Sequence, residues 1–180
     1  MQMNTLASQI EQMEANLQNL AQRMPDVPTT SLLMCRLILH VGREMSAMFA
    51  QQLRPFGLVE AEFRVLSTLY SQPDGTAHPG DLCGPASQSP ANMSRIGDEL
   101  VKRGLITRGL SLQDRRKMVL TITAQGEAFV RDLLPKLWVP LRELLKNIPE
   151  SDQRQLVDLL KRLGLEIEIA TPAPIAERAV

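Results

Sequence analysis

The sequence predicts a mostly helical fold of the α+β class, and three observations lead to this prediction. Aromatic residues make up only 3% of the 180 residues, so Leu and Met must fill the core, and both favour helices. Apolar residues recur at helical spacing along most of the chain. Stretches that favour strands are short and lie near residues 76–78, 105–110 and 118–123.

Composition restricts the classes of function. The formal net charge is zero, so a chain with an acidic partner must gather its basic residues locally. Cys35 and Cys83 are far apart and have no His at ligand spacing, which excludes a zinc site or disulfide scaffold. Without a signal segment or a run of 18 apolar residues, we expect a cytoplasmic protein with no membrane contact. No enzyme motif stands out, so we expect neither catalysis nor a cofactor or metal.

The first 57 residues predict two helices. Residues 1–24 carry an a/d stripe that needs a partner, either a second subunit or the chain's own helical region. The stripe consists of Leu6, Ile10, Met13, Leu17, Leu20 and Met24. Pro25 and Pro28 end this helix. The next helix, residues 31–54, is apolar nearly all round, which predicts burial on more than one face and therefore a subunit interface.

Residues 58–123 predict helix, short strand, helix, turn, helix, strand, turn and strand, in that order. A short helix begins at Pro79 and is expected to end at Gly84-Pro85. Ser89 is a favoured cap for the helix that follows, and Gly104 ends it. Two short helices joined by a tight turn and followed by a two-stranded ribbon form a winged helix-turn-helix.

The second helix of such a pair enters the DNA major groove and reads base edges with its N-terminal residues. Asn and Gln side chains can pair with adenine, and Arg can pair with guanine. The candidate reading residues are Ser87, Gln88, Ser89, Asn92, Met93, Ser94 and Arg95.

Basic residues gather in the same region. Residues 86–120 hold seven basic and three acidic residues, a local excess of four positive charges in a neutral chain. We expect Arg108 and the hairpin tip, with Arg115, Arg116 and Lys117, to grip phosphate or enter the minor groove. Asp114 is expected to orient one of these Arg residues. For the tip alone, the alternative is a solvated turn without a partner.

Residues 124–146 predict a long helix that Thr123 caps and that Pro135 and Pro140 kink or weaken. A last helix over residues 150–169 has an apolar face, and the tail, residues 170–180, is expected to be disordered. The apolar face consists of Leu156, Leu159, Leu160 and Leu163.

Residues 58–126 resemble the MarR family of bacterial transcription regulators. The wing pattern carries the resemblance, together with DELVKRGLITR before it and TAQGE after it. The pattern consists of Asp114, Arg116, Leu120, Ile122 and Thr123. Most of the chain, including the N-terminal extension, GLVEAEF and SRIGDELVKRG, resembles regulators of the EmrR type, which repress multidrug-efflux operons.

The resemblance implies a homodimer in which residues 31–57 and 124–169 form the dimerisation region. It also implies a repressor that binds a pseudo-palindromic double-stranded DNA operator. Two half-sites about one helical turn apart are expected. In this family, small lipophilic phenols or carboxylates such as salicylate bind where the dimer helices meet the winged domain, and DNA is released.

The matching surfaces in this chain supply candidate ligand residues. An anion needs a polar or cationic partner, and soft apolar side chains can form an adaptable wall. The candidates are Arg36, His40 and Arg43 for the anion, and Met34, Met45, Met48, Phe49 and Phe63 for the wall. The alternative is that the Met and Phe residues are ordinary core and the Arg residues are solvated.

Cys35 resembles the cysteine of the peroxide-sensing branch of the same family. That branch supports its thiolate with tyrosines, whereas this chain has Leu39 and Phe49 nearby, so a buried thiol is expected to stay protonated and inert. Cys83 is expected in the core. Two rival functions stay open: a thiol-redox regulator that uses Cys35, and a winged-helix module that binds another protein, with the N-terminal stripe as the dock.

Overall fold

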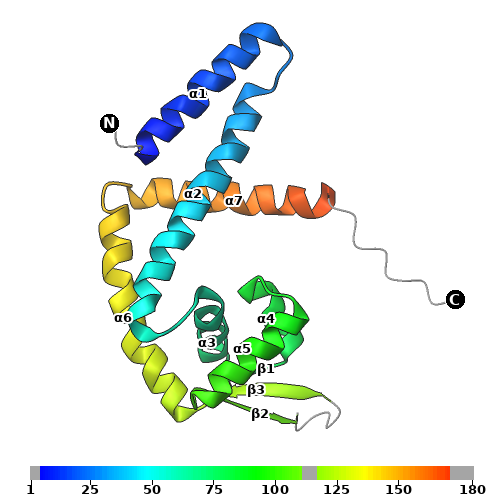
Figure 1. Ribbon diagram of the computed structural model, residues 1–180, viewed down its shortest axis with the longest axis vertical. Coiled ribbons are helices and arrows are strands. Elements are labelled where there is room, and N and C mark those ends of the chain that lie inside the picture. The colour runs from blue at the N-terminus through cyan, green and yellow to red at the C-terminus, as the bar shows by residue number, and fades with distance from the viewer. Residues whose placement is uncertain (1–4, 111–116, 171–180) are drawn as a thin grey trace, which may run out of the picture. The chain divides into compact units, whose positions relative to one another are not determined.

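The computed structural model describes residues 5–110 and 117–170, and it confirms a mostly helical fold with a small antiparallel sheet (Figure 1). The chain divides into two compact units, Met1–Val130 and Arg131–Val180. The first unit contains an N-terminal helical hairpin and the winged domain, and the second contains most of the C-terminal helices. No helix within the described ranges is both long and apolar enough to span a membrane.

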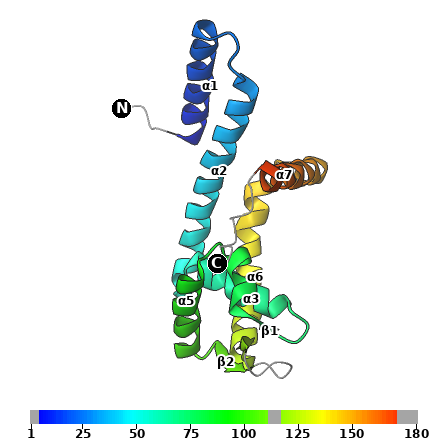
Figure 2. The same ribbon diagram turned by 90° about the vertical axis from the view of Figure 1, so that its right-hand side faces the viewer.

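The N-terminal hairpin consists of α1 (Leu6–Arg23) and α2 (Thr29–Leu53), which pack side by side (Figures 1 and 2). Thr5 caps α1, because its Oγ1 accepts a hydrogen bond from the Ser8 backbone N–H at 3.2 Å. Leu17, in the middle of the predicted stripe, is only 3% exposed. The stripe therefore has a partner within its own chain, which answers the question that the sequence left open.

A single 3₁₀ turn, η1 (Arg54–Phe56), leads from α2 into the winged domain. Gly57 follows it with φ +64°, a left-handed conformation that glycine adopts at little cost. η1 and Gly57 therefore form the linker between the hairpin and the winged domain.

The winged domain consists of three helices and a three-stranded sheet. The helices are α3 (Glu60–Ser71), α4 (Pro79–Ala86) and α5 (Pro90–Lys102), and the strands are β1 (Thr76–Ala77), β2 (Ile106–Leu110) and β3 (Met118–Ile122). The strands pair antiparallel in the order β1-β3-β2. The three helices and the strands β2 and β3 contribute side chains to one core. Its largest fully buried members include Leu66, Leu69, Leu82, Met93, Leu100, Ile106 and Leu120.

The end of α4 differs from the prediction. The helix continues through Gly84 and Pro85 to Ala86, and Ser87 ends it in the left-handed conformation with φ 53°. The backbone N–H groups of Ser87 and Gln88 bond back to the carbonyls of Gly84 and Cys83, at 2.9 Å each. These bonds close the last turn, so one proline near the end does not stop the helix.

The C-terminal helices are α6 (Ala124–Leu145) and α7 (Glu150–Ala170). Thr123 caps α6 as predicted, because its Oγ1 accepts from the Gly126 N–H at 2.9 Å and donates to the Gly104 carbonyl at 2.7 Å. Helix α6 continues through both Pro135 and Pro140. In the single chain, α7 has no buried residue.

Candidate nucleic-acid interface

The N-terminal end of α5 is built as a capped, exposed helix start. The Ser89 Oγ accepts from the Asn92 backbone N–H at 3.3 Å, and Pro90 occupies the first helical position. The left-handed Ser87 turns the chain sharply between α4 and α5. This turn leaves Ser87, Ser89, Ser94 and Arg95 exposed, with Gln88 and Asn92 half-buried.

Three of the predicted reading residues form a hydrogen-bonded array along this surface. The Asn92 amide donates to the Gln88 side-chain oxygen. Nε and Nη2 of Arg95 donate to the Asn92 Oδ1 at 3.2 and 3.0 Å. Both ends of the Asn92 amide are therefore engaged within the protein, while Arg95 is held by one edge of its planar guanidinium.

The structure corrects the prediction for Met93. Its side chain is 1% exposed and lies in the core, on the inward face of α5 with Ile96, Gly97 and Leu100. Spacings of three, four and seven residues place these positions on one face of a helix. Helical periodicity in the sequence thus identifies Met93 as a core residue, whatever its distance from the start of the helix.

Arg108 on β2 is tied to α5. Its Nη2 lies 2.9 Å from the Asp98 Oδ1 and donates to the Ser94 carbonyl at 3.3 Å. A Cβ added at Gly97 would lie 2.9 Å from the same nitrogen, so the guanidinium lies directly over this glycine. Arg108 therefore joins the base of the wing to the reading helix, a role that its sequence position does not predict.

The predicted hairpin tip falls mostly outside the described residues. Asp114, Arg115 and Arg116 lie outside them, while Lys117 is described and exposed just before β3. The role of the basic tip thus stays a prediction.

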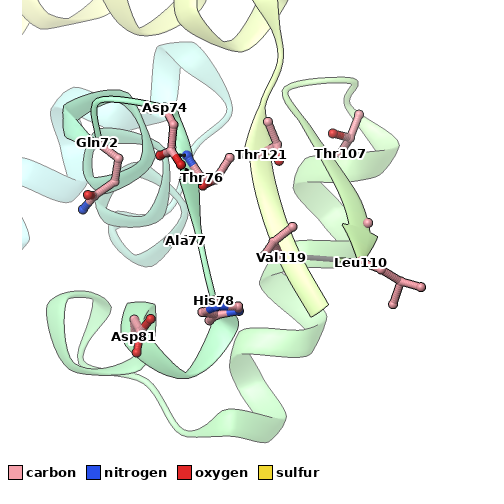
Figure 3. Close-up of a pocket in the computed structure, with 11 residues that line it drawn as sticks. Gln72, Asp74, Thr76, Ala77, His78, Asp81, Thr107, Leu110, Val119 and Thr121 are labelled. Atoms are coloured by element: carbon pink, nitrogen blue, oxygen red, sulfur yellow. Dashed lines mark hydrogen bonds between the residues drawn. The ribbon is translucent and has the colours of Figure 1, made fainter. Parts of the chain in front are cut away.

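A cavity of about 520 Å³ lies on the outer face of the wing sheet, between the strands and the start of α4 (Figure 3). Threonines 76, 107 and 121 line it, one from each strand. The Thr76 hydroxyl and backbone N–H donate to Asp74 at 2.7 and 3.1 Å and lower the pKa of that carboxyl. Among the described residues, none that is predicted to contact DNA or ligand lines this cavity.

The predicted ligand residues are only partly brought together. Phe49 of α2 and Phe63 of α3 meet edge to face, with ring centroids 5.1 Å apart. His40 is 7% exposed and its Nδ1 lies 2.9 Å from the Arg43 Nη2, while its buried Nε2 has no hydrogen-bond partner among the residues that the structure describes. Met34, Arg36 and Met45 are exposed, and Met48 is half-buried.

The two cysteines are less buried than predicted. Cys35 is exposed on α2 in the single chain. Cys83 is half-buried, with its Sγ 3.4 Å from the Pro79 carbonyl oxygen. Across the described ranges, no three His, Cys, Asp or Glu residues are grouped to hold a metal ion.

Comparisons with known proteins agree with this arrangement. The model of the MarR family matches residues 58–118. The transcriptional repressor MprA of Escherichia coli is 33% identical over 161 residues, which cover 89% of this chain and 90% of MprA. The chain belongs to the MarR family. Its relatives regulate transcription and are not enzymes, and this MarR-family protein is likewise a DNA-binding transcription regulator, of the EmrR type.

Solved MarR-family structures share the fold. AbsC from Streptomyces coelicolor is 22% identical and superposes with a TM-score of 0.72, covering 79% of this chain and 97% of AbsC. A mutant of Escherichia coli MarR, solved in complex with operator DNA, is 24% identical with a TM-score of 0.64. The match covers 79% of this chain and 96% of the MarR chain.

Proposed function

We propose that this MarR-family regulator is a homodimeric repressor of a multidrug-efflux or stress operon. It binds a pseudo-palindromic operator and leaves it when a small aromatic ligand such as salicylate binds. The observation that carries the DNA-binding part is the exposed, capped start of α5, with Arg95 held in place by Asn92. A side chain that is already oriented loses less conformational entropy when it binds a base.

The array at the start of α5 favours guanine as the base read by Arg95. Asn92 occupies the Nε–Nη2 edge of the guanidinium, and this contact does not use the terminal Nη1–Nη2 edge. Two parallel N–H groups at that edge match the O6 and N7 acceptors of guanine. In this arrangement Asn92 positions Arg95 and does not read adenine, although its residue type suggests a contact to adenine.

The test uses operator DNA that the wild type selects from a random-sequence library, with fluorescence anisotropy as the readout. We expect Arg95→Ala to lose discrimination at one G·C pair in each half-site by about 1–3 kcal/mol. Lys117→Ala should weaken binding to all sequences alike. It should also reduce the slope of the logarithm of affinity against the logarithm of salt concentration by about one. Arg23→Ala, at the exposed end of α1, is the matched control and should change neither.

Asn92→Ser separates the two roles of Asn92. If Asn92 positions Arg95, the serine variant loses discrimination at the same G·C pair as Arg95→Ala. If Asn92 reads adenine directly, the loss falls at a different base pair, and the positioning role is refuted.

The exposed apolar surface of α7 supports the homodimer. Seven of its apolar residues are at least 43% exposed in the single chain, and an amphipathic helix of this kind needs a partner. They are Leu156, Val157, Leu159, Leu160, Leu165, Ile167 and Ile169. Sedimentation equilibrium should give twice the mass of one chain, and Leu160→Glu should shift this towards the monomer. Gln155→Glu, an exposed polar position on the same helix, should leave the mass unchanged.

The polar pair on α2 supports the response to an anionic aromatic ligand. Arg43 is exposed beside the buried His40, and Phe49 and Phe63 lie further along the same helix and on α3. Salicylate should weaken operator binding by the wild type, and Arg43→Gln should require a higher salicylate concentration for the same release. If salicylate releases Arg43→Gln as readily as the control Arg23→Gln, Arg43 is not the anion's partner.

A further inference from the structure

Arg103 is the residue at which the reading helix meets the linker from α2. It follows Lys102 as the C-cap of α5, and its guanidinium crosses to the end of η1. Nη1 donates to the Gly57 carbonyl at 2.8 Å, and Nη2 donates to the Phe56 carbonyl at 3.1 Å. One planar side chain therefore binds two successive carbonyls of the linker.

Two further groups enclose the same guanidinium. The Glu62 Oε2 on α3 lies 3.8 Å from Arg103 Nη1, and the Glu62 side chain is 11% exposed. The same oxygen accepts the Val59 backbone N–H at 3.0 Å, so Glu62 is fixed at the start of α3. The Phe129 ring, on α6, lies 5.8 Å from the guanidinium carbon, within the range of a cation–π contact.

The contacts of Arg103 thus include both connections of the winged domain. The chain enters the domain through η1 and Gly57, and it leaves through α6, which carries Phe129. A lysine ammonium is a single point of charge and cannot bond two carbonyls in one plane while lying over a ring, as a guanidinium does. The geometry therefore requires arginine specifically.

A second polar route joins α2 to the helix-turn-helix. The Ser46 hydroxyl donates to Glu60 at 2.6 Å, Glu60 pairs with Arg64 at 2.6 Å, and Arg64 donates to the Pro85 carbonyl at 3.3 Å. The Arg64 side chain is 46% exposed, and exposed ion pairs of this kind contribute little. Arg103, which is 25% exposed, is the more enclosed connection.

We propose that Arg103 is a positioning residue that fixes the angle of α5 relative to the linker, and through it the half-site spacing that the dimer accepts. This inference rests on the proposed dimeric repressor. In a two-fold dimer, a small rotation of each reading helix changes the distance between the two major-groove contacts. A loosened connection should therefore widen the range of spacings that bind, while each half-site is still read.

The test measures binding to the selected operator and to versions with one or two base pairs added or removed between the half-sites. We expect Arg103→Lys to lose about tenfold of the wild-type preference for the selected spacing, a typical size for coupling between sites. Its preference for the correct bases within a half-site should not change. Lys102→Gln, the exposed neighbour on α5, is the matched control and should keep the wild-type preference.

Glu62→Gln is the second variant, because it removes the charge beside Arg103 and keeps an oxygen that can accept the Val59 N–H. Glu62→Gln should also widen the range of half-site spacings that bind. The test can therefore still be made if Arg103→Lys folds poorly. The melting temperature of each variant, measured alongside, distinguishes positioning from general stability.

The outcomes separate this inference from the proposed function. If both variants retain the wild-type spacing preference, Arg103 does not set the angle of α5. If they lose affinity for all DNA in parallel with their melting temperature, the role is structural and the inference fails. A wild type that shows no spacing preference contradicts the two-half-site operator itself, and this inference with it.

Discussion

Gly126 lies where the first turn of α6 packs against the backbone before β2. A Cβ added at this position would lie 2.1 Å from the Leu105 carbonyl oxygen and 2.8 Å from the Ile122 Cγ1. The carbonyl cannot easily move, because it also accepts the Thr123 N–H at 3.0 Å and shares the Thr123 hydroxyl proton, at 3.2 Å, with the Gly104 carbonyl. Gly126→Ala must therefore displace backbone by about an ångström, well beyond what a packed interior absorbs freely.

Opposing terms set the size of the effect. Alanine gains up to about 1 kcal/mol over glycine inside a helix. Overpacking costs about 1–3 kcal/mol or more, and weakening the two Thr123 bonds costs about 1 kcal/mol each. We therefore expect Gly126→Ala to lower the free energy of unfolding by about 2–4 kcal/mol, and the melting temperature by roughly 5–12 °C.

Thermal and urea unfolding, followed by circular dichroism at 222 nm, measure this change. Gly42→Ala, inside α2, is the matched control, because a Cβ there meets no atom of the described part of the chain within 4 Å. It should raise stability by up to about 1 kcal/mol. If Gly126→Ala melts at or above the wild-type temperature, the close approach of α6 to the Leu105 carbonyl is not rigid, and the reasoning fails.

Three further predictions concern other parts of the first unit. Ser46→Ala removes the hydrogen bond that lowers the pKa of Glu60, so it should cost about 0.5–1 kcal/mol at neutral pH. Because the pKa of Glu60 is depressed in the folded state, the difference in the free energy of unfolding between wild type and variant should shrink as the pH falls through that pKa. Unfolding titrations at several pH values measure this difference, and one that does not change with pH would contradict the prediction. Met93→Ala should cost about 2–5 kcal/mol in urea unfolding and leave base preference unchanged, and an altered preference would restore Met93 as a reading residue. Leu17→Ala should reduce the hydrogen-exchange protection of α1 more than that of α5, and equal loss would mean that the hairpin is not a separate cooperative unit.

The sequence predicted the helix and strand order because the local signals agreed with one another. Ser89 followed by proline marked the start of α5, and Thr123 marked the start of α6, and both side chains accept the hydrogen bonds expected of caps. Gly104 has φ +71°, as the end of a helix requires. Each of these signals depends on residues within four positions, which is why sequence alone reveals them.

The tertiary contacts were harder to predict. The charge of Arg108 and its place in the wing predict a DNA contact, yet its partner Asp98 is on α5 and is brought close only by the fold. The residue type of Asn92 predicts a contact to adenine, whereas its contacts to Gln88 and Arg95 depend on rotamers that no spacing rule specifies. The sequence shows Arg103 only as a positive charge, because its carbonyl partners are 46 and 47 residues away.

The absence of a side chain at Gly97 has a consequence for genetics. An alanine there would push the Arg108 guanidinium away from Ser94 and Asp98, since a flexible side chain yields more easily than backbone. A selection for mutants with altered operator preference should therefore recover position 97, although that residue faces the core and touches no base. In such a mutant the altered operator preference would come from the displaced side chain of Arg108, although Arg108 itself is not mutated.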